Sequence, residues 1–268
     1  MSIIKPRNRN VQQFFRSGPL PCPYLPDRVE RKLFTRVAGP DAAALNSQLT
    51  RAGFRRSHDI IYRPVCDTCS ACVPVRIPVA VFRPNRTMRR LLRTHDDLVI
   101  TARSPEPTLE QFELFQHYQG SRHSDSDMAR MTASDYAAMM EEGAFAALVF
   151  EARSPDGRLL AVMLADKLSD GLSAVYCFYD TDGQRRSLGT IMILKLVEAV
   201  RHQGLDHVYL GYWVQNSPRM DYKRKFQPIE RMVGGRWVPE PARQTVCDPS
   251  GSTKSTAQPS WPRVPEED

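Results

Sequence analysis

Four consecutive stretches indicate the order strand, loop, helix and strand. The first strand is LSAVYCFYD (172–180), the loop is GQRRSLGT (183–190), the helix covers 188–203, and the second strand is HVYLGYWV (207–214). Both outer stretches are rich in β-branched and aromatic residues, which favour strands. The middle segment repeats its apolar residues with a helical period, and Ser187 stands where an N-cap is expected. Because two parallel strands need a crossover between them, this order predicts a parallel pair joined by the helix.

Two further strand candidates precede this unit, at 144–152 and 158–168, and the turn signals SPDG (154–157) and SDG (169–171) close them into hairpins. Three antiparallel strands, a polar loop, a helix and a parallel strand form an order that resembles the GNAT acyltransferase fold. In that fold, the loop before the central helix offers backbone N–H groups to the phosphates of an acyl carrier. The expected class is therefore α+β, with a GNAT-like acyltransferase domain and a smaller Cys-containing N-terminal domain.

Composition divides the chain into an N-terminal arm (1–20), a Cys-rich basic domain (21–105), the transferase domain (106–238) and a tail (239–268). The tail is rich in Pro, Ser and Thr and is expected to be disordered. Within the Cys-rich domain, 73–79 has the composition of a strand, and its prolines confine it to a sheet edge or to irregular extended structure.

The net charge of +7 is unevenly distributed along the chain. Residues 1–105 carry 19 Lys and Arg against 7 Asp and Glu, a net +12, whereas the remainder carries 18 against 23, a net −5. A basic half suggests a polyanionic partner that is bound through counterion release. The alternative is a solvated basic face on a protein of high pI.

Some protein classes are excluded by features that the sequence lacks. No segment approaches the ~20 apolar residues of a membrane helix, so no membrane partner is expected. The N-terminus is polar and basic without an apolar region, so no secretory signal is expected and the expected location is the cytoplasm. No set of Ser, His and carboxylate residues forms a hydrolase signature, and the six histidines are scattered without ligand spacing.

The cysteines form the most specific local pattern. Cys66, Cys69 and Cys72 make a C-x2-C-x2-C run, and Cys22 lies upstream in PCPY. Disulfides are unfavoured in a cytosolic protein, whereas three thiolates at this spacing converge readily on one metal or cluster, and Cys22 would complete a set of four. Zinc and an iron–sulfur cluster both fit such a set. The alternative is three reduced cysteines that pack a turn.

The loop before the central helix is a candidate anion site. Arg185, Arg186, Ser187 and Gly189 combine two guanidiniums, a helix N-terminus and a glycine where backbone can approach a ligand. The alternative is an ordinary capped helix start with two surface arginines.

The last strand of this unit ends with LGYW (210–213), and the run RMDYKRKF (219–226), in which basic and aromatic residues are interleaved, follows it. Phosphates meet Lys and Arg while bases stack on rings, so the run suits the end of a nucleic acid. A short helix is expected at 217–226. Its apolar residues would then be buried, and both interpretations can hold at once.

Together these motifs resemble the bacterial members of the arginyl-tRNA–protein transferase family, and most closely its aspartate/glutamate leucyltransferase branch. The resemblance covers about residues 11–237, and the Cys run and the stretch from Gly211 to Lys223 are its most specific parts. Arg219 stands where Lys is commoner. The matching pieces are CPYLP (22–26), GFRRS (53–57), YRP (62–64), PVRIP (74–78), RH (122–123), DGLSAVY (170–176), RRSLGT (185–190), LGYW (210–213), and Met220 with Tyr222 and Lys223.

The resemblance implies a reaction in which the α-amine of a protein beginning with Asp or Glu attacks the ester carbonyl of leucyl-tRNA. The added leucine then marks that protein for degradation through the N-end rule. An aminoacyl ester is already activated, and an α-amine has a reference pKa of ~7.7–8.0, so positioning and a donor to the oxyanion can supply most of the acceleration. The chemistry itself requires no cofactor.

Each candidate residue has an expected role in this reaction. Tyr212, Tyr222 and Lys223 line the reacting centre, where Lys223 or a tyrosine hydroxyl stabilises the oxyanion. Arg56 and Arg76 are candidates to pair the acceptor's acidic side chain, because a carboxylate suits a bidentate guanidinium. The 3′ end of the tRNA is held by Arg185, Arg186, Ser187, Gly189 and Arg219, and the structural or redox-sensing metal or cluster by Cys22, Cys66, Cys69 and Cys72.

Three alternatives stay open on the sequence. Arginine is the main competitor to leucine as the donor amino acid. An acyl-CoA-dependent N-acetyltransferase has the same fold, although its phosphate loop is usually richer in glycine than 185–189. A non-enzymatic, metal-stabilised RNA-binding module would explain the basic half and the Cys run without any transfer.

Overall fold

The computed structural model describes residues 12–141, 145–182 and 187–240 of the 268-residue chain. Arg185 and Arg186, residues 1–11 of the predicted arm and residues 241–268 of the predicted tail lie outside the described residues. Within the described ranges, no helix combines the length and the apolar character that a membrane span requires.

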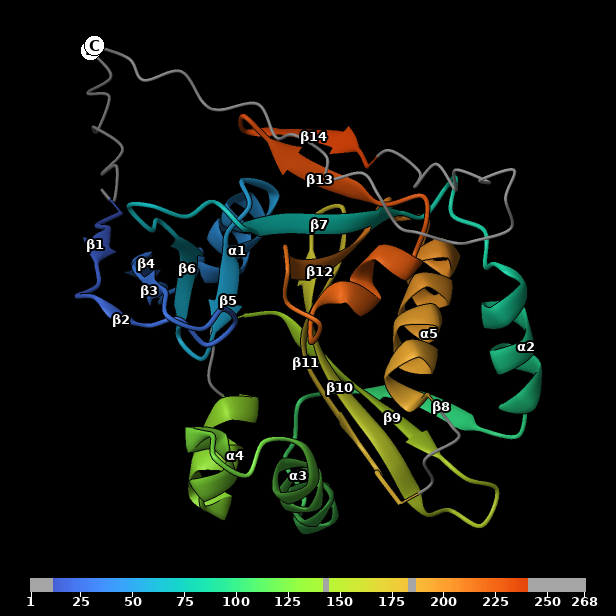
Figure 1. The fold of residues 1–268 in the computed structure, drawn as a ribbon. Helices are drawn as coiled ribbons and strands as arrows, with labels where there is room; N and C mark the ends of the chain where they lie inside the picture. The colour runs from blue at the N-terminus through green and yellow to red at the C-terminus, as the bar shows by residue number, and fades with distance from the viewer. Residues whose placement is uncertain (1–11, 142–144, 183–186, 241–268) are drawn as a thin grey trace, which may run out of the picture.

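An eight-stranded sheet forms the centre of the molecule (Figure 1). Its strand order is β14-β13-β7-β12-β11-β10-β9-β8, and only the pair β11 and β12 is parallel. The predicted order of three antiparallel strands, a helix and a parallel strand is confirmed over β9 to β12. The eight strands are β7 (Cys72–Pro78), β8 (Val99–Arg103), β9 (Ala147–Arg153), β10 (Leu159–Leu168), β11 (Gly171–Tyr179), β12 (His207–Val214), β13 (Glu230–Val233) and β14 (Arg236–Pro239).

Helices cover both faces of this sheet (Figure 1). The connection from β11 to β12 runs through α5, which packs with α2 on one face, while α3 and α4 pack on the other. The helices are α1 (Ala42–Arg51), α2 (Arg86–Thr94), α3 (Leu109–Arg122), α4 (Ala133–Glu141) and α5 (Leu188–His202), with the 3-10 helices η1 (Asp127–Arg130) and η2 (Asp221–Lys225).

The central strand β10 explains why both faces are covered. Ala161 and Met163 belong to the apolar core beneath α5, whereas Val162 and Leu164 belong to the core beneath α3. Successive side chains of a strand point to opposite faces of the sheet. An almost continuous apolar strand therefore needs a layer of helices on each side.

A smaller four-stranded sheet of order β1-β4-β6-β5 adjoins the large one, together with the short pair β2-β3. Helix α1 packs against both β5 and β10 and so joins the two sheets. The large sheet takes β7 and β8 from the predicted Cys-rich domain, and the predicted boundary at residue 105 stays a prediction. The strands of the smaller sheets are β1 (Phe15–Arg16), β2 (Leu20–Pro21), β3 (Val29–Glu30), β4 (Lys32–Arg36), β5 (Arg55–Ser57) and β6 (Ile60–Pro64).

Two predictions of local structure are wrong. Strand β7 lies between β13 and β12, not at a sheet edge. Because β13 pairs only with Val75 and Arg76, β7 has a neighbour on one side only at Pro74 and Pro78, where a proline is tolerated. The helix predicted at 217–226 is instead the shorter 3-10 helix η2.

Candidate active site

The parallel strands β11 and β12 separate partway along their length. They pair only over their first three residues, ending at Ser173 opposite Tyr209, although β11 has nine residues and β12 has eight. Backbone groups that lose a ladder partner need another one. The opening between the two strands therefore has to be filled by side chains or by a ligand.

Arg55 of β5 crosses this opening. Its Nη2 donates to the carbonyl oxygen of Val175 on β11 at 2.7 Å, and its Nη1 donates to that of Leu210 on β12 at 3.3 Å. Gly211 has a φ of 70°, and a Cβ at this position would collide with the guanidinium. Sequence reasoning did not select Arg55. The available signal was its place beside Arg56 in a strand, where neighbouring side chains point to opposite sides.

Lys223 lies buried beside this opening. It is 3 % exposed, and its Nζ donates to the carbonyl oxygen of Tyr212. Burial, followed by the positive charge of Arg55, holds the pKa of Lys223 well below its ordinary value. The neutral amine is thereby favoured, so Lys223 is better suited to accepting a proton than to stabilising an oxyanion by charge.

The two predicted tyrosines have different surroundings. Tyr222 is 40 % exposed, and desolvation around its hydroxyl raises its pKa to about 12. The hydroxyl of Tyr212 is buried, 2.9 Å from the carbonyl oxygen of Gly53 and 3.1 Å from that of Tyr62. Tyr212 therefore fastens β12 to the smaller sheet, and Tyr222 is the tyrosine accessible to a ligand.

The start of α5 lies beside aromatic rings at the end of β11. A Cβ at Gly189 would stand 3.1 Å from the ring of Tyr179, whose centroid is 5.0 Å from that of Tyr118. Ser187 occupies the predicted N-cap position, in a left-handed conformation and without a side-chain cap hydrogen bond. A helix N-terminus without a side-chain cap, next to ring faces, suits a phosphate and a base. Arg185 and Arg186, the other two residues of the predicted anion site, lie outside the described residues.

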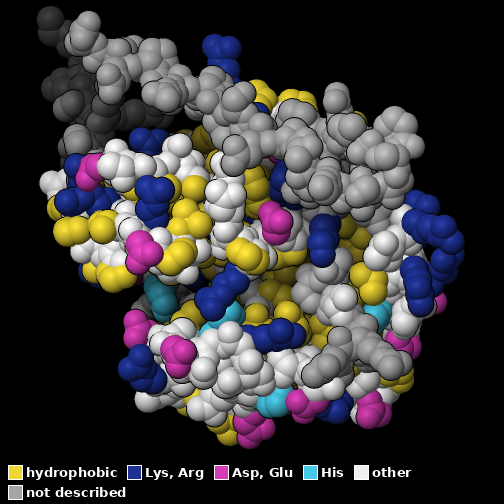
Figure 2. Space-filling view, in the orientation of Figure 1, with side chains coloured by type: hydrophobic (Ala, Val, Ile, Leu, Met, Phe, Trp, Pro, Cys, Tyr) yellow, Lys and Arg dark blue, Asp and Glu magenta, His cyan; other side chains and the backbone are white. Residues whose placement is uncertain are grey.

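An open hollow of about 390 Å³ lies between residues 22–26 and residues 217–219. Figure 2 shows the surface hollowed near its centre, with Lys and Arg side chains at the rim. Arg219 lines the hollow, and burial followed by the charges of Arg219 and Arg122 lowers the pKa of His123. Within the described part of the chain, neither of these arginines forms an ion pair. Arg219 therefore offers the hollow a guanidinium that no carboxylate of the described residues pairs, and the charge of Arg122 acts on the same histidine as Arg219.

The two arginines predicted to bind the acceptor are engaged elsewhere. Arg56 is 4 % exposed, and its Nη1 donates to a buried oxygen of Asp166 at 2.6 Å. The Nε of Arg76 donates to Glu230 at 2.7 Å, and its Nη1 donates to the hydroxyl of Tyr209 at 3.1 Å. Because both guanidiniums already pair with carboxylates of the protein, an acceptor-binding role does not fit the geometry.

The four predicted metal ligands come from two segments, and Cys22, Cys66 and Cys69 lie near enough to Cys72 to act on its pKa. Cys22 follows β2, while Cys66, Cys69 and Cys72 lie between β6 and the start of β7, and all four are half-buried. Burial, followed by the proximity of the other three thiols, raises the pKa of Cys72 to about 12. A bound cation would reverse this effect by favouring thiolates. The chemistry of this donor set fits a zinc ion or an iron–sulfur cluster.

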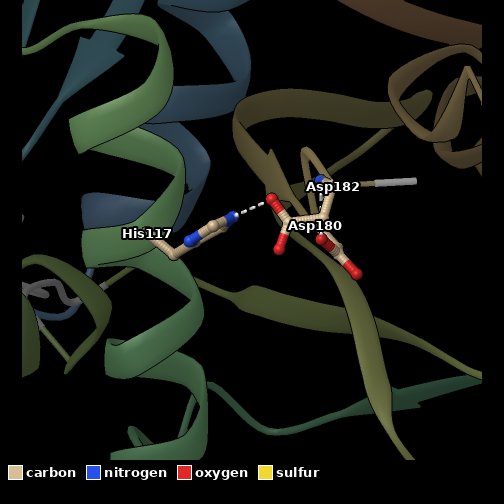
Figure 3. Close-up of side chains that lie close together, drawn as sticks. All are labelled: His117, Asp180 and Asp182. Atoms are coloured by element: carbon tan, nitrogen blue, oxygen red, sulfur yellow. Dashed lines mark hydrogen bonds and ion pairs between the residues drawn. The ribbon is translucent and has the colours of Figure 1, made fainter. Parts of the chain in front are cut away.

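A more closely spaced group of potential ligands lies at the far end of β11 (Figure 3). Among the described residues, His117, Asp180 and Asp182 bring three ligand atoms within 4.8 Å of one another. The Nε2 of His117 is 3.2 Å from Asp182 and 3.0 Å from the hydroxyl of Thr181, and Arg158 donates to Asp180 at 2.6 Å. Since these groups already contact one another or Arg158, we interpret them as a polar link between α3 and β11.

Two family models match the chain. They are described as "Arginine-tRNA-protein transferase, N terminus", over residues 20–90, and "Arginine-tRNA-protein transferase, C terminus", over residues 110–233. Both the Cys run and the separated strands fall within these matches.

Relatives with the name aspartate/glutamate leucyltransferase align over most of the chain. The one from Gluconobacter oxydans (strain 621H) is 52% identical over 84% of this chain and 94% of its own. The one from Granulibacter bethesdensis is 50% identical over 89% of both chains. Among solved structures, L-PGS from Bacillus licheniformis is 12% identical with a TM-score of 0.47, over 63% of this chain and 58% of that one.

Proposed function

The chain belongs to the arginine-tRNA–protein transferase family, and we propose that it transfers leucine from leucyl-tRNA to the N-terminal α-amine of proteins that begin with Asp or Glu. One observation carries the proposal: 52% identity, over 84% of this chain and 94% of the relative, with a protein named for that donor and those acceptors. The enzyme is thus an aminoacyltransferase. The added N-terminal leucine marks the product protein for degradation through the N-end rule.

The arrangement of β9 to β12 and α5 supports a GNAT-like acyltransferase domain within residues 106–238. In this proposal the 3′ end of the tRNA lies at the start of α5. The helix N-terminus at Ser187 and Gly189 faces a phosphate, and the ring of Tyr179 offers a stacking surface. We assign Arg185 and Arg186, from the loop before α5, to the same grip, where they would add positive charge, whereas Arg219 lines the hollow and is assigned to the acceptor.

The reaction needs one bond made, one broken and one proton moved. The acceptor amine attacks the ester carbonyl, the new C–N bond forms, and the ester C–O bond breaks to free the ribose hydroxyl. Lys223, with its amine biased towards neutrality, is the candidate to take the proton that the attacking amine loses, which finally goes to the ribose oxygen. With a pKa of about 12, Tyr222 stays protonated at neutral pH and can donate to the developing oxyanion.

The acceptor's acidic side chain is best placed in the hollow between residues 22–26 and 217–219. Arg219 lines the hollow without a carboxylate partner among the described residues, and its charge acts on His123 together with that of Arg122. A guanidinium pairs a carboxylate through two hydrogen bonds. These residues therefore replace Arg56 and Arg76 as the proposed acceptor site.

The four cysteines are proposed to have a structural role. Cys22, Cys66, Cys69 and Cys72 would hold zinc or an iron–sulfur cluster, which when bound supplies a crosslink between the two segments. Tyr24, two residues after Cys22, lines the hollow, so this crosslink would hold one wall of it in place. No step of the transfer passes through the metal.

The proposal is tested by offering the full chain several donors and acceptors. Peptides that begin with Asp, Glu, Lys or Arg are each incubated with tRNA carrying labelled leucine, with tRNA carrying labelled arginine, or with labelled acetyl-CoA. An N-acetylated Asp peptide serves as the control, because it lacks the attacking amine. We expect label only from leucyl-tRNA and only on the free Asp and Glu peptides. If label came from arginyl-tRNA or acetyl-CoA and not from leucyl-tRNA, leucine would be wrong as the proposed donor.

A further inference from the structure

Helix α2 carries a stripe of arginines on its exposed face. Arg86, Arg90 and Arg93 recur at spacings of four and three residues, so they lie on one side of the helix and extend over about 10 Å of its axis. Arg83 and Arg89 flank the stripe, and all five arginines are exposed. Figure 2 shows a gathering of Lys and Arg side chains at the right edge, where Figure 1 places α2.

The opposite side of α2 fixes the direction of this stripe. Met88 is 3 % exposed, and Leu91 and Leu92 pack against the same apolar core as α5. The side chain of Asn85 caps the helix by accepting from the backbone N–H of Met88. With one face anchored and the start capped, the arginines cannot rotate into the protein.

Acidic residues are scarce around this stripe in the sequence. The sequence has no Asp or Glu between Asp67 and Asp96, and the helix has no acidic residue in its first turn. Among the described residues, no ion pair involves the three arginines of the stripe. Like charges one turn apart repel one another, and a cation in the first turn faces the positive end of the helix dipole. The arrangement is locally unfavourable, and a polyanion would offset it.

We propose that the stripe of Arg86, Arg90 and Arg93 binds the sugar-phosphate backbone of the acceptor arm of the tRNA substrate, away from the reacting ester. The inference rests on the proposed function, which supplies the polyanion. Helix α2 packs against α5, whose first turn is the proposed grip on the 3′ end. An acceptor arm that leaves the start of α5 can therefore run along α2. Guanidiniums in a row bind successive phosphates without reading the base sequence.

A matched pair of triple variants tests the stripe. In the first, Arg86→Gln, Arg90→Gln and Arg93→Gln remove three charges, while glutamine keeps a good helix propensity. In the control, Arg36→Gln, Arg130→Gln and Arg236→Gln remove three charges from exposed positions on β4, η1 and β14. Affinity for uncharged tRNA is measured between about 50 and 200 mM salt, with transfer kinetics in parallel.

We expect the stripe variant to lower the slope of log affinity against log salt by about two to three, roughly one for each phosphate that is no longer bound. The KM for leucyl-tRNA should rise roughly tenfold or more, since each missing guanidinium weakens binding of the whole tRNA. The turnover number and the KM for the acceptor peptide should stay unchanged. The control variant should match the wild type in slope and in KM. Arg90→Gln alone, with an expected slope change of about one, covers the case in which the triple variant unfolds.

A stripe variant with the wild-type salt slope and the wild-type KM for leucyl-tRNA would overturn the inference. An equal loss of affinity in both triple variants would also overturn it, because net charge rather than the stripe would then explain the binding. The failure of the proposed function looks different. In that case the wild type transfers no leucine, whereas the salt slope on uncharged tRNA still reports whether the stripe binds RNA.

Discussion

Replacing Arg55 by methionine removes the guanidinium that joins β11 to β12 and keeps an unbranched but shorter side chain. The variant lacks the hydrogen bonds to Val175 at 2.7 Å and to Leu210 at 3.3 Å. A hydrogen bond from a charged group contributes about 1.5–3 kcal/mol, so two give an upper value of about 3–6 kcal/mol. The second bond is long and the side chain is not fully buried, so we expect the free energy of unfolding to fall by about 2–4 kcal/mol.

Urea unfolding at neutral pH measures this decrease, with Arg63→Met as the matched control. Arg63 is exposed on β6, and its guanidinium lies 5.2 Å from the ring of Phe54. An exposed cation–π interaction of this kind contributes less than about 1 kcal/mol, so the control should remain close to the wild type. If both variants were destabilised by the same small free energy, below about 1 kcal/mol, Arg55 would not be the bridge between the strands.

The same variant has a second consequence, through Lys223. The charge of Arg55 contributes to lowering the pKa of Lys223, so its removal should raise that pKa towards the ordinary value. If the neutral amine of Lys223 takes the proton, the rising limb of activity against pH moves to higher pH in Arg55→Met. A pH profile of kcat/KM for the acceptor peptide measures the shift. If the rising limb of the pH profile stays at the wild-type pH, the pKa of Lys223 does not determine that limb.

Three further changes test other parts of the structure. Lys223→Met should lower turnover roughly 100-fold. In the wild type, the free energy of unfolding should rise from neutral pH towards pH 10.5, because folded Lys223 has a lowered pKa and binds fewer protons in this range than the unfolded chain does. Lys223→Met should lack this rise, which urea unfolding across the range measures. Parallel curves of unfolding free energy against pH for the two proteins would contradict the lowered pKa. Arg219→Gln should raise the KM for Asp and Glu peptides roughly tenfold with little change in turnover, because a charged hydrogen bond to the carboxylate is removed, and an unchanged peptide KM would move the acceptor elsewhere. Cys72→Ser should lower the bound zinc or iron found by elemental analysis, and a metal content equal to that of the wild type would remove Cys72 from the ligand set.

The larger sheet is predictable from the sequence where its signals are local. Strands β9 to β12 and helix α5 follow from apolar runs, turn residues and a helical period, and their order implies the parallel pair. The position of β7 depends instead on β13, a strand far along the chain that covers only Val75 and Arg76. A proline lacks the backbone N–H that would donate a hydrogen bond at its own position, but the sequence does not show how far a neighbouring strand extends along it.

The candidate site was predictable in its residue types more than in their roles. Arg56 and Arg76 look like free guanidiniums in the sequence, because their partners Asp166 and Glu230 are 110 and 154 residues away. Arg55, one residue from Arg56, faces the opening between the strands. Alternation along a strand predicts that the two arginines point to opposite sides. Only the packing of the two sheets decides which of them reaches the site.

Leucine transfer itself can be followed by the mass of an acceptor peptide after incubation with the folded protein and leucyl-tRNA. We expect a peptide beginning with Asp to gain one leucine residue at its N-terminus, and a matched peptide beginning with Lys to keep its mass. An Asp peptide of unchanged mass, from folded protein that still binds leucyl-tRNA, would contradict the proposed activity.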